Sequence, residues 1–217
     1  MYKAIIFDLD GTLLNTIEDI TDSLNIALAS ENLPTHGVEE TKAFVGSGVK
    51  IMVERATKGL DCTDEQKKRV LDVYMKEYTV RQSIKTCPYD GMIDALKEIQ
   101  RENILIGLLS NKPHQDTLRV VDHYYGLHLF NVVLGQREGV PIKPNPTALF
   151  EIMRDLKVEP KDCIFVGDSD VDMLTATNAK IDKIGVLWGF RTRQVLQACK
   201  ADYIVDNPKE ILDILKK

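Results

Sequence analysis

The feature that most restricts the fold is a regular alternation of short apolar runs with helix-like stretches. The apolar runs occupy residues 3–8, 104–109, 131–134, 163–166, 183–187 and 203–205. Helix-like stretches lie between them, at residues 92–100, 117–125, 146–156, 171–179 and 208–215. Strands that alternate with helices are typical of parallel sheets, because parallel neighbours need a crossover connection. The alternation therefore predicts a doubly wound, Rossmann-like α/β fold with a parallel sheet.

One long stretch breaks this alternation. Between Ile17 and Arg81 the apolar residues recur at helical spacing, and no convincing strand is present. Residues 87–91 contain proline and glycine and are typical of a return hinge. We therefore expect an α/β core formed by residues 1–14 and 84–217, with a small helical domain over residues 15–83 inserted after the first strand.

Composition excludes several classes of protein. With 217 residues and 44% hydrophobic content the chain can bury a sizeable core, and its net charge of −5 disfavours a nucleic-acid partner. The apolar runs are far shorter than the about 18 residues of a membrane span. The four cysteines show no metal-binding spacing, so reduced thiols are expected. We expect a soluble cytoplasmic protein, a monomer or a homodimer, without a membrane partner.

Polar side chains follow the apolar runs where the predicted strands end. In such sheets ligands bind just outside the carboxyl ends of the strands. The residues at these ends or just downstream are Asp8, Asp10, Ser110, Asn111, Lys143, Asp168 and Asp172. Crowded carboxylates repel one another unless a cation lies among them, and oxygen ligands favour magnesium. The sequence therefore predicts a Mg²⁺ site.

Four segments together resemble the motifs of the haloacid-dehalogenase-like phosphohydrolases, and they occur in the family's order. The first is Asp8-Leu9-Asp10-Gly11-Thr12, and the others are Leu109-Ser110-Asn111-Lys112, Lys143-Pro144 and Gly167-Asp168-Ser169-Asp170-Val171-Asp172. The resemblance spans nearly the whole chain. It implies a phosphatase that works through a phosphoaspartyl intermediate. An acid at position 10 favours phosphate chemistry over carbon–halogen or carbon–phosphorus cleavage.

The resemblance also implies a role for each motif residue. Asp8 would attack phosphorus, and Asp10 would protonate the leaving alcohol and then activate water. Ser110 would donate a hydrogen bond to phosphate, and Lys143 would offset negative charge. The metal ligands would be Asp8, the backbone carbonyl of Asp10 and Asp168, with Asp172 nearby or acting through water.

The inserted helical domain would then act as a cap that selects small substrates. Residues 44–50 resemble the cap segment of phosphoglycolate phosphatases, and residues 186–191 resemble a loop of the same enzymes and of related pyrophosphatases. We expect a phosphoglycolate-like substrate. The candidate substrate-binding residues are Thr12, Gly46, Ser47, Gly48, Lys50 and Asn111, and Arg55 is an alternative to Lys50 for meeting a substrate carboxylate.

Other interpretations stay open. An inorganic pyrophosphatase or a sugar phosphomutase can be built on the same four motifs, and a phosphoacceptor signalling module also uses a magnesium-bound aspartate at a strand end. Gly46 and Gly48 are equally compatible with a plain helix connection, and Trp188 with core packing. Asn15 departs from the family pattern, in which an acid is common, and so do residues 177–180, where small residues and glycine are usual.

Overall fold

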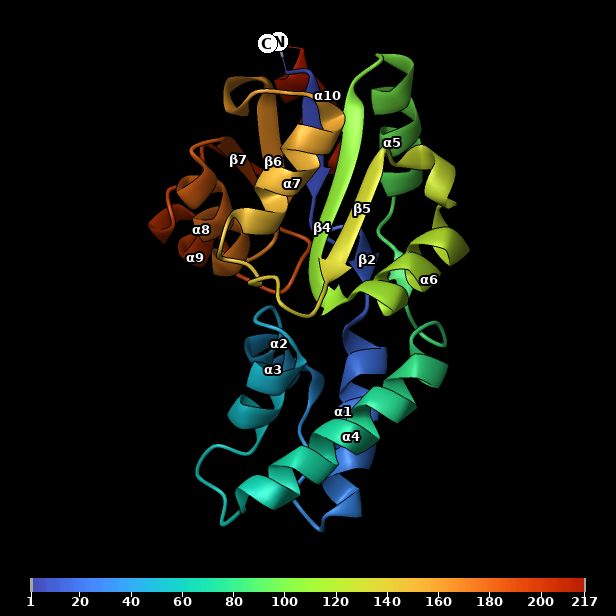
Figure 1. Ribbon diagram of the computed structural model, residues 1–217, viewed down its shortest axis with the longest axis vertical. Helices are drawn as coiled ribbons and strands as arrows, with labels where there is room; N and C mark the ends of the chain where they lie inside the picture. The colour runs from blue at the N-terminus through green and yellow to red at the C-terminus, as the bar shows by residue number, and fades with distance from the viewer. Residues whose placement is uncertain (1, 217) are drawn as a thin grey trace. The chain divides into compact units, whose positions relative to one another are not determined.

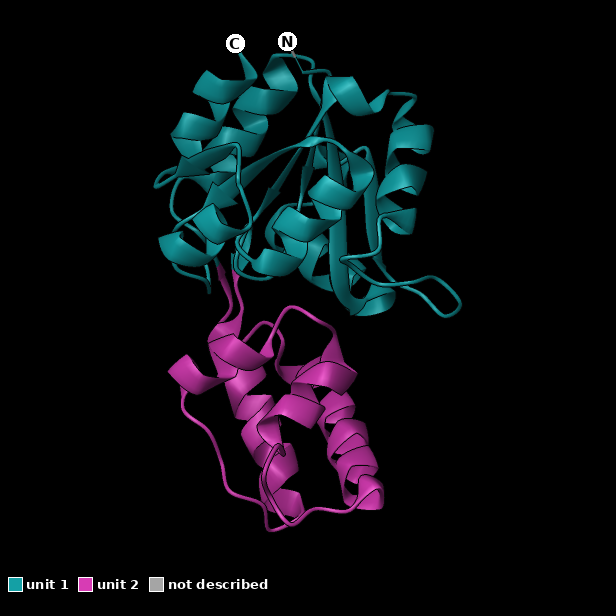
Figure 2. Cartoon of the chain, turned by 90° about the vertical axis from the view of Figure 1, so that its left-hand side faces the viewer, with its two compact units in different colours: residues 1–14, 88–217 teal, residues 15–87 magenta. Residues whose placement is uncertain are grey.

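The structure is a computed structural model that describes residues 2–216. The chain forms two compact units (Figure 2). The described residues up to Leu14, together with those from Pro88 onward, form the α/β unit, and Asn15–Cys87 form the helical unit. The two connections between the units pair as short strands, β2 (Leu14–Asn15) and β3 (Cys87–Pro88).

The α/β unit is built on a sheet of six strands in the order β5-β4-β1-β6-β7-β8, and each pair of neighbours is parallel. The strands are β1 (Ala4–Phe7), β4 (Leu105–Pro113), β5 (Val132–Gln136), β6 (Cys163–Gly167), β7 (Asp182–Val186) and β8 (Tyr203–Val205). After β1 the chain forms β4 and β5 on one side of that strand, and then β6, β7 and β8 on the other side. The predicted doubly wound α/β fold is thus confirmed.

Helices cover both faces of this sheet (Figure 1). On β1, Ile5 and Phe7 belong to one buried cluster with residues of α5, α6 and α10, whereas Ala4 and Ile6 belong to another with residues of α7 and α8. Successive side chains of a strand point to opposite faces, so a strand buried on both sides is continuously apolar. The helices are α5 (Met92–Arg101), α6 (His114–Tyr124), α7 (Thr147–Leu156), α8 (Asp170–Ala179), α9 (Arg193–Ala198) and α10 (Pro208–Leu215), with 3₁₀ turns at Leu127–Leu129 and Pro160–Asp162.

The observed elements differ from the predicted ones mainly at their ends. β4 continues to Pro113, four residues beyond the predicted end, because Ser110–Lys112 are extended although their side chains are polar. α6 begins at His114, directly after Pro113, rather than at residue 117. α9 was not predicted, since six residues are too few for a clear helical period.

The helical unit has its own apolar core. It consists of α1 (Ile17–Ser30), α2 (Val38–Phe44), α3 (Val49–Ala56) and α4 (Asp64–Arg81). Leu24 and Leu28 of α1 are fully buried and belong to the same cluster as Val70 and Tyr74 of α4. No convincing strand was expected between residues 17 and 81, and these described residues contain none.

Within residues 2–216 no helix has both the length and the apolar character that crossing a membrane requires. All four cysteines, Cys62, Cys87, Cys163 and Cys199, are free thiols.

A buried carboxylate fixes the end of the helical unit. Asp19, in the first turn of α1, is 1% exposed and accepts hydrogen bonds from the backbone N–H groups of Ile84, Lys85 and Thr86 at 2.8–3.1 Å. The Thr86 hydroxyl also donates to it, at 2.7 Å. Residues 84–86 lie outside any helix or strand, so Asp19 accepts from their N–H groups where the chain leaves α4; the N–H of Ile84 also donates to the Arg81 carbonyl, at 3.0 Å.

Replacing Asp19 with Ala should therefore destabilise the helical unit. The buried N–H and hydroxyl of Thr86 and the part-buried N–H of Lys85 would lose their acceptor, and we expect the free energy of unfolding to fall by about 2–4 kcal/mol. Urea unfolding followed by circular dichroism measures the change. Asp22→Ala on the same helix is the matched control, since Asp22 forms only a partly exposed ion pair with Lys85 and should cost less than about 1 kcal/mol. Equal losses in the two variants would contradict the role of Asp19.

Candidate active site

The strand register places the acidic residues at one end of the sheet. Phe7, the last residue of β1, lies beside Val166 of β6, and the N–H of Asp8 donates to the Val166 carbonyl at 2.9 Å. Asp8 therefore leaves β1 next to the point where Asp168 leaves β6. This is where the strand order of the sheet switches direction, the usual position of a ligand site in such folds.

The loop after β1, residues 8–14, is tightly folded. The N–H groups of Thr12, Leu13 and Leu14 all donate to the Leu9 carbonyl, at 2.9–3.2 Å. Gly11 has a φ of +89°, and a Cβ there would lie 2.4 Å from Oδ2 of Asp168. Only glycine fits this close approach at positive φ.

Asp8, Asp168 and Asp172 converge in the interior. They are 7%, 2% and 1% exposed, and each offers a carboxylate oxygen within 4.8 Å of the others. Burial, followed by the charge of Asp172, raises the pKa of Asp8 well above its usual range and that of Asp168 to about 7. The site thus contains more buried negative charge than its surroundings neutralise.

Lys143 is the cation that faces this cluster. Its Nζ lies 2.6 Å from Oδ1 of Asp8 and 2.7 Å from Oδ1 of Asp172. Burial alone would lower the pKa of Lys143, but the charges of Asp172 and Asp8 outweigh it and raise that pKa. Lys143 is therefore held as a cation between two carboxylates.

The residues fit a divalent metal ion. Three buried carboxylates against one lysine leave a net negative charge, and carboxylate oxygens are the ligands that Mg²⁺ and Ca²⁺ prefer. Asp172 is the least available of the three. Its Oδ2 accepts from the N–H and the hydroxyl of Ser169, at 3.1 and 2.6 Å, and so closes the capping box of α8.

Asp10 lies in the same loop as Asp8 but has a different partner. Nζ of Lys112 is 2.8 Å from its Oδ1, and both side chains are largely buried. Lys112 was not among the predicted site residues. A signal for it was available, because Ser110 and Lys112 fall on the same side if the strand continues through these residues, as β4 does.

Ser110 and Asn111 both lie at the end of β4. The Ser110 hydroxyl accepts from the N–H of Lys112 at 3.1 Å. The Asn111 side chain pairs with the backbone of Lys143, donating to its carbonyl at 3.0 Å and accepting from its N–H at 2.8 Å. Asn111, which the sequence predicts to bind substrate, thus pairs with the backbone of Lys143 in this structure.

Thr12, a further predicted substrate-binding residue, is fully buried. Its carbonyl accepts a hydrogen bond from the indole N–H of Trp188 at 2.9 Å. Its hydroxyl has no hydrogen-bond partner among the described residues.

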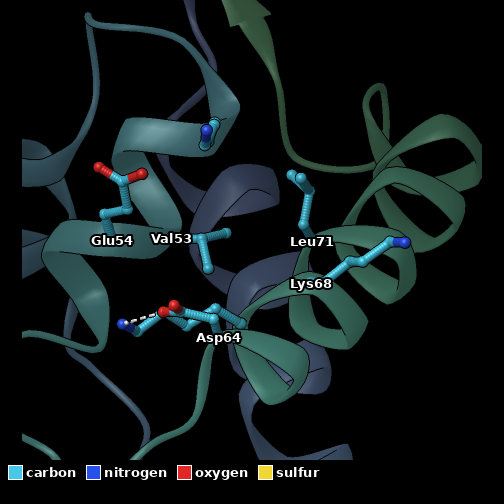
Figure 3. A pocket seen from close by; sticks show the side chains of 7 residues that line it. Val53, Glu54, Asp64, Lys68 and Leu71 are labelled. Carbon is cyan, nitrogen blue, oxygen red and sulfur yellow. Dashed lines mark hydrogen bonds and ion pairs between the residues drawn. The ribbon is translucent and has the colours of Figure 1, made fainter.

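The other predicted substrate-binding residues belong to the helical unit. Gly46 and Gly48 have φ values of +113° and +82°, and this positive φ is enough to explain why glycine occupies both positions. The Ser47 hydroxyl accepts a hydrogen bond from Arg55 at 3.0 Å. Lys50, in the first turn of α3, lines a pocket of about 440 Å³ in the helical unit (Figure 3). The other lining residues are Val53, Glu54, Asp64, Lys67, Lys68 and Leu71.

Comparison with known proteins identifies relatives along nearly the whole chain. The phosphoglycolate phosphatase of Pasteurella multocida is 30% identical and is aligned over 99% of both chains. Phosphoglycolate phosphatase 1 of Pseudomonas aeruginosa is 28% identical, over 97% of this chain and 78% of its own length.

Solved structures agree with this similarity. A crystal structure from Lactobacillus delbrueckii subsp. bulgaricus superimposes with a TM-score of 0.92 at 32% identity, over 99% of this chain and 98% of its own. A predicted phosphoglycolate phosphatase from Haemophilus somnus also gives a TM-score of 0.92, at 27% identity, over 98% and 97%.

The family model for haloacid dehalogenase-like hydrolases matches residues 5–186. This range contains all four motifs on which the resemblance was based, from Asp8 to Asp172. The resemblance is confirmed, and the chain belongs to the haloacid dehalogenase-like hydrolase family.

Proposed function

We propose that the protein is a magnesium-dependent phosphatase that hydrolyses a small phosphorylated metabolite, a phosphoglycolate-like phosphomonoester, through a phosphoaspartyl intermediate. The observation that carries this proposal is the convergence of Asp8, Asp168 and Asp172 with Lys143 beside them. The similarity to phosphoglycolate phosphatases along the whole chain supports the substrate class.

The carboxylates of Asp8 and Asp168 and the backbone carbonyl of Asp10 would hold the ion, with Asp172 nearby or acting through water. When bound, Mg²⁺ neutralises negative charge on the phosphate and on the nucleophile. Lys143 adds a second positive charge at Asp8, 2.6 Å away, so that an anionic carboxylate can approach an anionic phosphate.

In the first step an oxygen of Asp8 attacks phosphorus, and the bond from phosphorus to the alcohol oxygen breaks. Asp10 gives its proton to the leaving oxygen. Ser110 donates a hydrogen bond to the phosphate, since its oxygen accepts from the N–H of Lys112 and its O–H donates to none of the described residues. In the second step Asp10 takes a proton from water, the water oxygen attacks phosphorus, and Asp8 is released together with phosphate.

We further propose that the helical unit acts as a cap for a catalytic core; from the sequence, the cap is predicted over residues 15–83 and the core over residues 1–14 and 84–217. Its separate apolar core supports a unit that can move as one body. Gly46, Ser47, Gly48 and Lys50 would contact the substrate, and Lys50 would meet its carboxylate. The contacts of Asn111 support a role in positioning Lys143 rather than a substrate contact.

Location and assembly are part of the same proposal. Four free thiols suit a reducing compartment, so we propose that the enzyme acts in the cytoplasm, as a monomer or a homodimer.

A phosphate-release screen tests the substrate class. The purified protein with Mg²⁺ should release phosphate from phosphoglycolate with a higher kcat/KM than from sugar phosphates, nucleotides or pyrophosphate. Preference for pyrophosphate would establish the pyrophosphatase alternative instead, and an isomerised sugar phosphate the phosphomutase. A single turnover that stops at a stable phosphoprotein would establish a phosphoacceptor module.

Replacing Asp8 with Asn should lower kcat by at least about 1,000-fold, because the variant keeps the shape of the side chain but lacks the attacking carboxylate. Asp155→Asn is the control, since Asp155 is exposed and, among the described residues, forms an ion pair with Arg154 alone. Steady-state phosphate release measures both variants. Turnover near that of the wild type in Asp8→Asn would refute the assigned nucleophile.

Removal of metal should abolish turnover, and Mg²⁺ should restore it, because the buried carboxylates need a second cation beside Lys143. Binding should also raise the Tm, since an ion at 100 times its Kd stabilises the folded state by about 2.7 kcal/mol. Calorimetry with and without a chelator checks this independently of activity. If a chelator changes neither the turnover nor the Tm of the protein, the metal assignment is contradicted.

A further inference from the structure

The segment that follows β7, Trp188–Phe190, contacts both the loop after β1 and Asp168. The indole N–H of Trp188 donates to the Thr12 carbonyl at 2.9 Å. The backbone N–H of Phe190 donates to Oδ2 of Asp168 at 2.6 Å. One short segment thus joins two parts of the acidic site that are about 150 residues apart in sequence.

Gly189 makes these two contacts possible because it has no side chain. A Cβ at this position would lie 2.2 Å from Cβ of Asp168 and 2.5 Å from the Gly11 carbonyl oxygen. Neither neighbour is the flexible end of a side chain, so a larger residue must displace one of them.

Asp168 is confined from both sides as a result. Gly11 approaches its carboxylate so closely that a Cβ there would lie 2.4 Å from Oδ2, and Gly189 packs against its Cβ. The Phe190 N–H engages Oδ2 and so restricts rotation of the carboxylate. The side chain of Asp168 has little freedom to turn away from Asp8 and Asp172.

We propose that Trp188–Phe190 is a positioning segment that sets the affinity of the site for a divalent cation. Gly189 and Phe190 fix the direction of the Asp168 carboxylate, and Trp188 fixes the loop that carries Asp8 and Asp10. The inference rests on the proposed role of Asp168 as a metal ligand. Groups that orient a ligand in this way are as much part of a metal site as the ligand itself.

Magnesium binding to the whole protein, without substrate, tests the proposal. Trp188 is the only tryptophan of the chain, so its fluorescence reports on this segment during a Mg²⁺ titration, and the Mg²⁺-dependent rise in Tm gives a second measure. In Gly189→Ala the apparent Kd for Mg²⁺ should rise about tenfold or more. Activity should recover as the Mg²⁺ concentration is raised, which a general loss of structure would not allow.

Gly37→Ala is the matched control. Gly37 also has an ordinary φ, and the nearest atom to a Cβ there, Oε2 of Glu40, is 3.7 Å away. The Kd of the Gly37→Ala variant for Mg²⁺ should stay within about twofold of the wild-type value. If Gly189→Ala folds, judged by circular dichroism, and binds Mg²⁺ as tightly as this control, the proposal is overturned.

If Gly189→Ala does not fold, a second variant, Trp188→Phe, tests whether the segment Trp188–Phe190 sets the affinity for Mg²⁺. Trp188→Phe keeps an aromatic ring but removes the donor to Thr12, and it should weaken Mg²⁺ binding measurably in the Tm assay. Unchanged binding in that variant would overturn the proposal. The proposed function fails separately: a wild-type protein that binds Mg²⁺ but hydrolyses no phosphate ester would refute the phosphatase and leave the positioning segment intact.

Discussion

The burial of three carboxylates against one lysine is the constraint on which the rest of the site depends. Asp8, Asp168 and Asp172 carry more negative charge than Lys143 can neutralise. Buried charges are stable only when hydrogen bonds and ion pairs of fixed geometry compensate for the lost solvation. The surrounding polar contacts serve this purpose: Asn111 holds the backbone of Lys143, Ser169 holds Asp172, and the segment after β7 holds Asp168.

The sheet supplies the rigid frame for this charge cluster. Its central strand, β1, is buried on both faces and hydrogen-bonded on both edges, so its last residues have no alternative register. Asp8, the proposed nucleophile, therefore directly follows a strand that is fixed on both faces and both edges. The residues of the cluster come from segments far apart in sequence, and the parallel arrangement brings their ends to one edge.

Much of the fold could be predicted from the sequence because the apolar runs are strong local signals. The position of Asp8 and Asp168 at one edge of the sheet could be predicted for the same reason, because Asp8 ends an apolar run and Asp168 follows the glycine after another. The contacts of Lys112 and Asn111 could not be predicted, because the direction of a polar side chain depends on how far β4 continues, and the polar end of β4 carries no apolar pattern. Asp19 was also missed, since an acid in the first turn of a helix is ordinary, and its partners lie 65 or more residues away.

The pairing of β2 with β3 bears on how such a protein can change over evolutionary time. The two points at which the chain departs from the α/β unit and rejoins it are neighbours in a two-stranded sheet. A segment whose ends lie together can be exchanged, lengthened or deleted without rethreading the strands around it. Recombination at this pair of strands would replace the helical unit in a single event and leave the acidic cluster of the α/β unit in place.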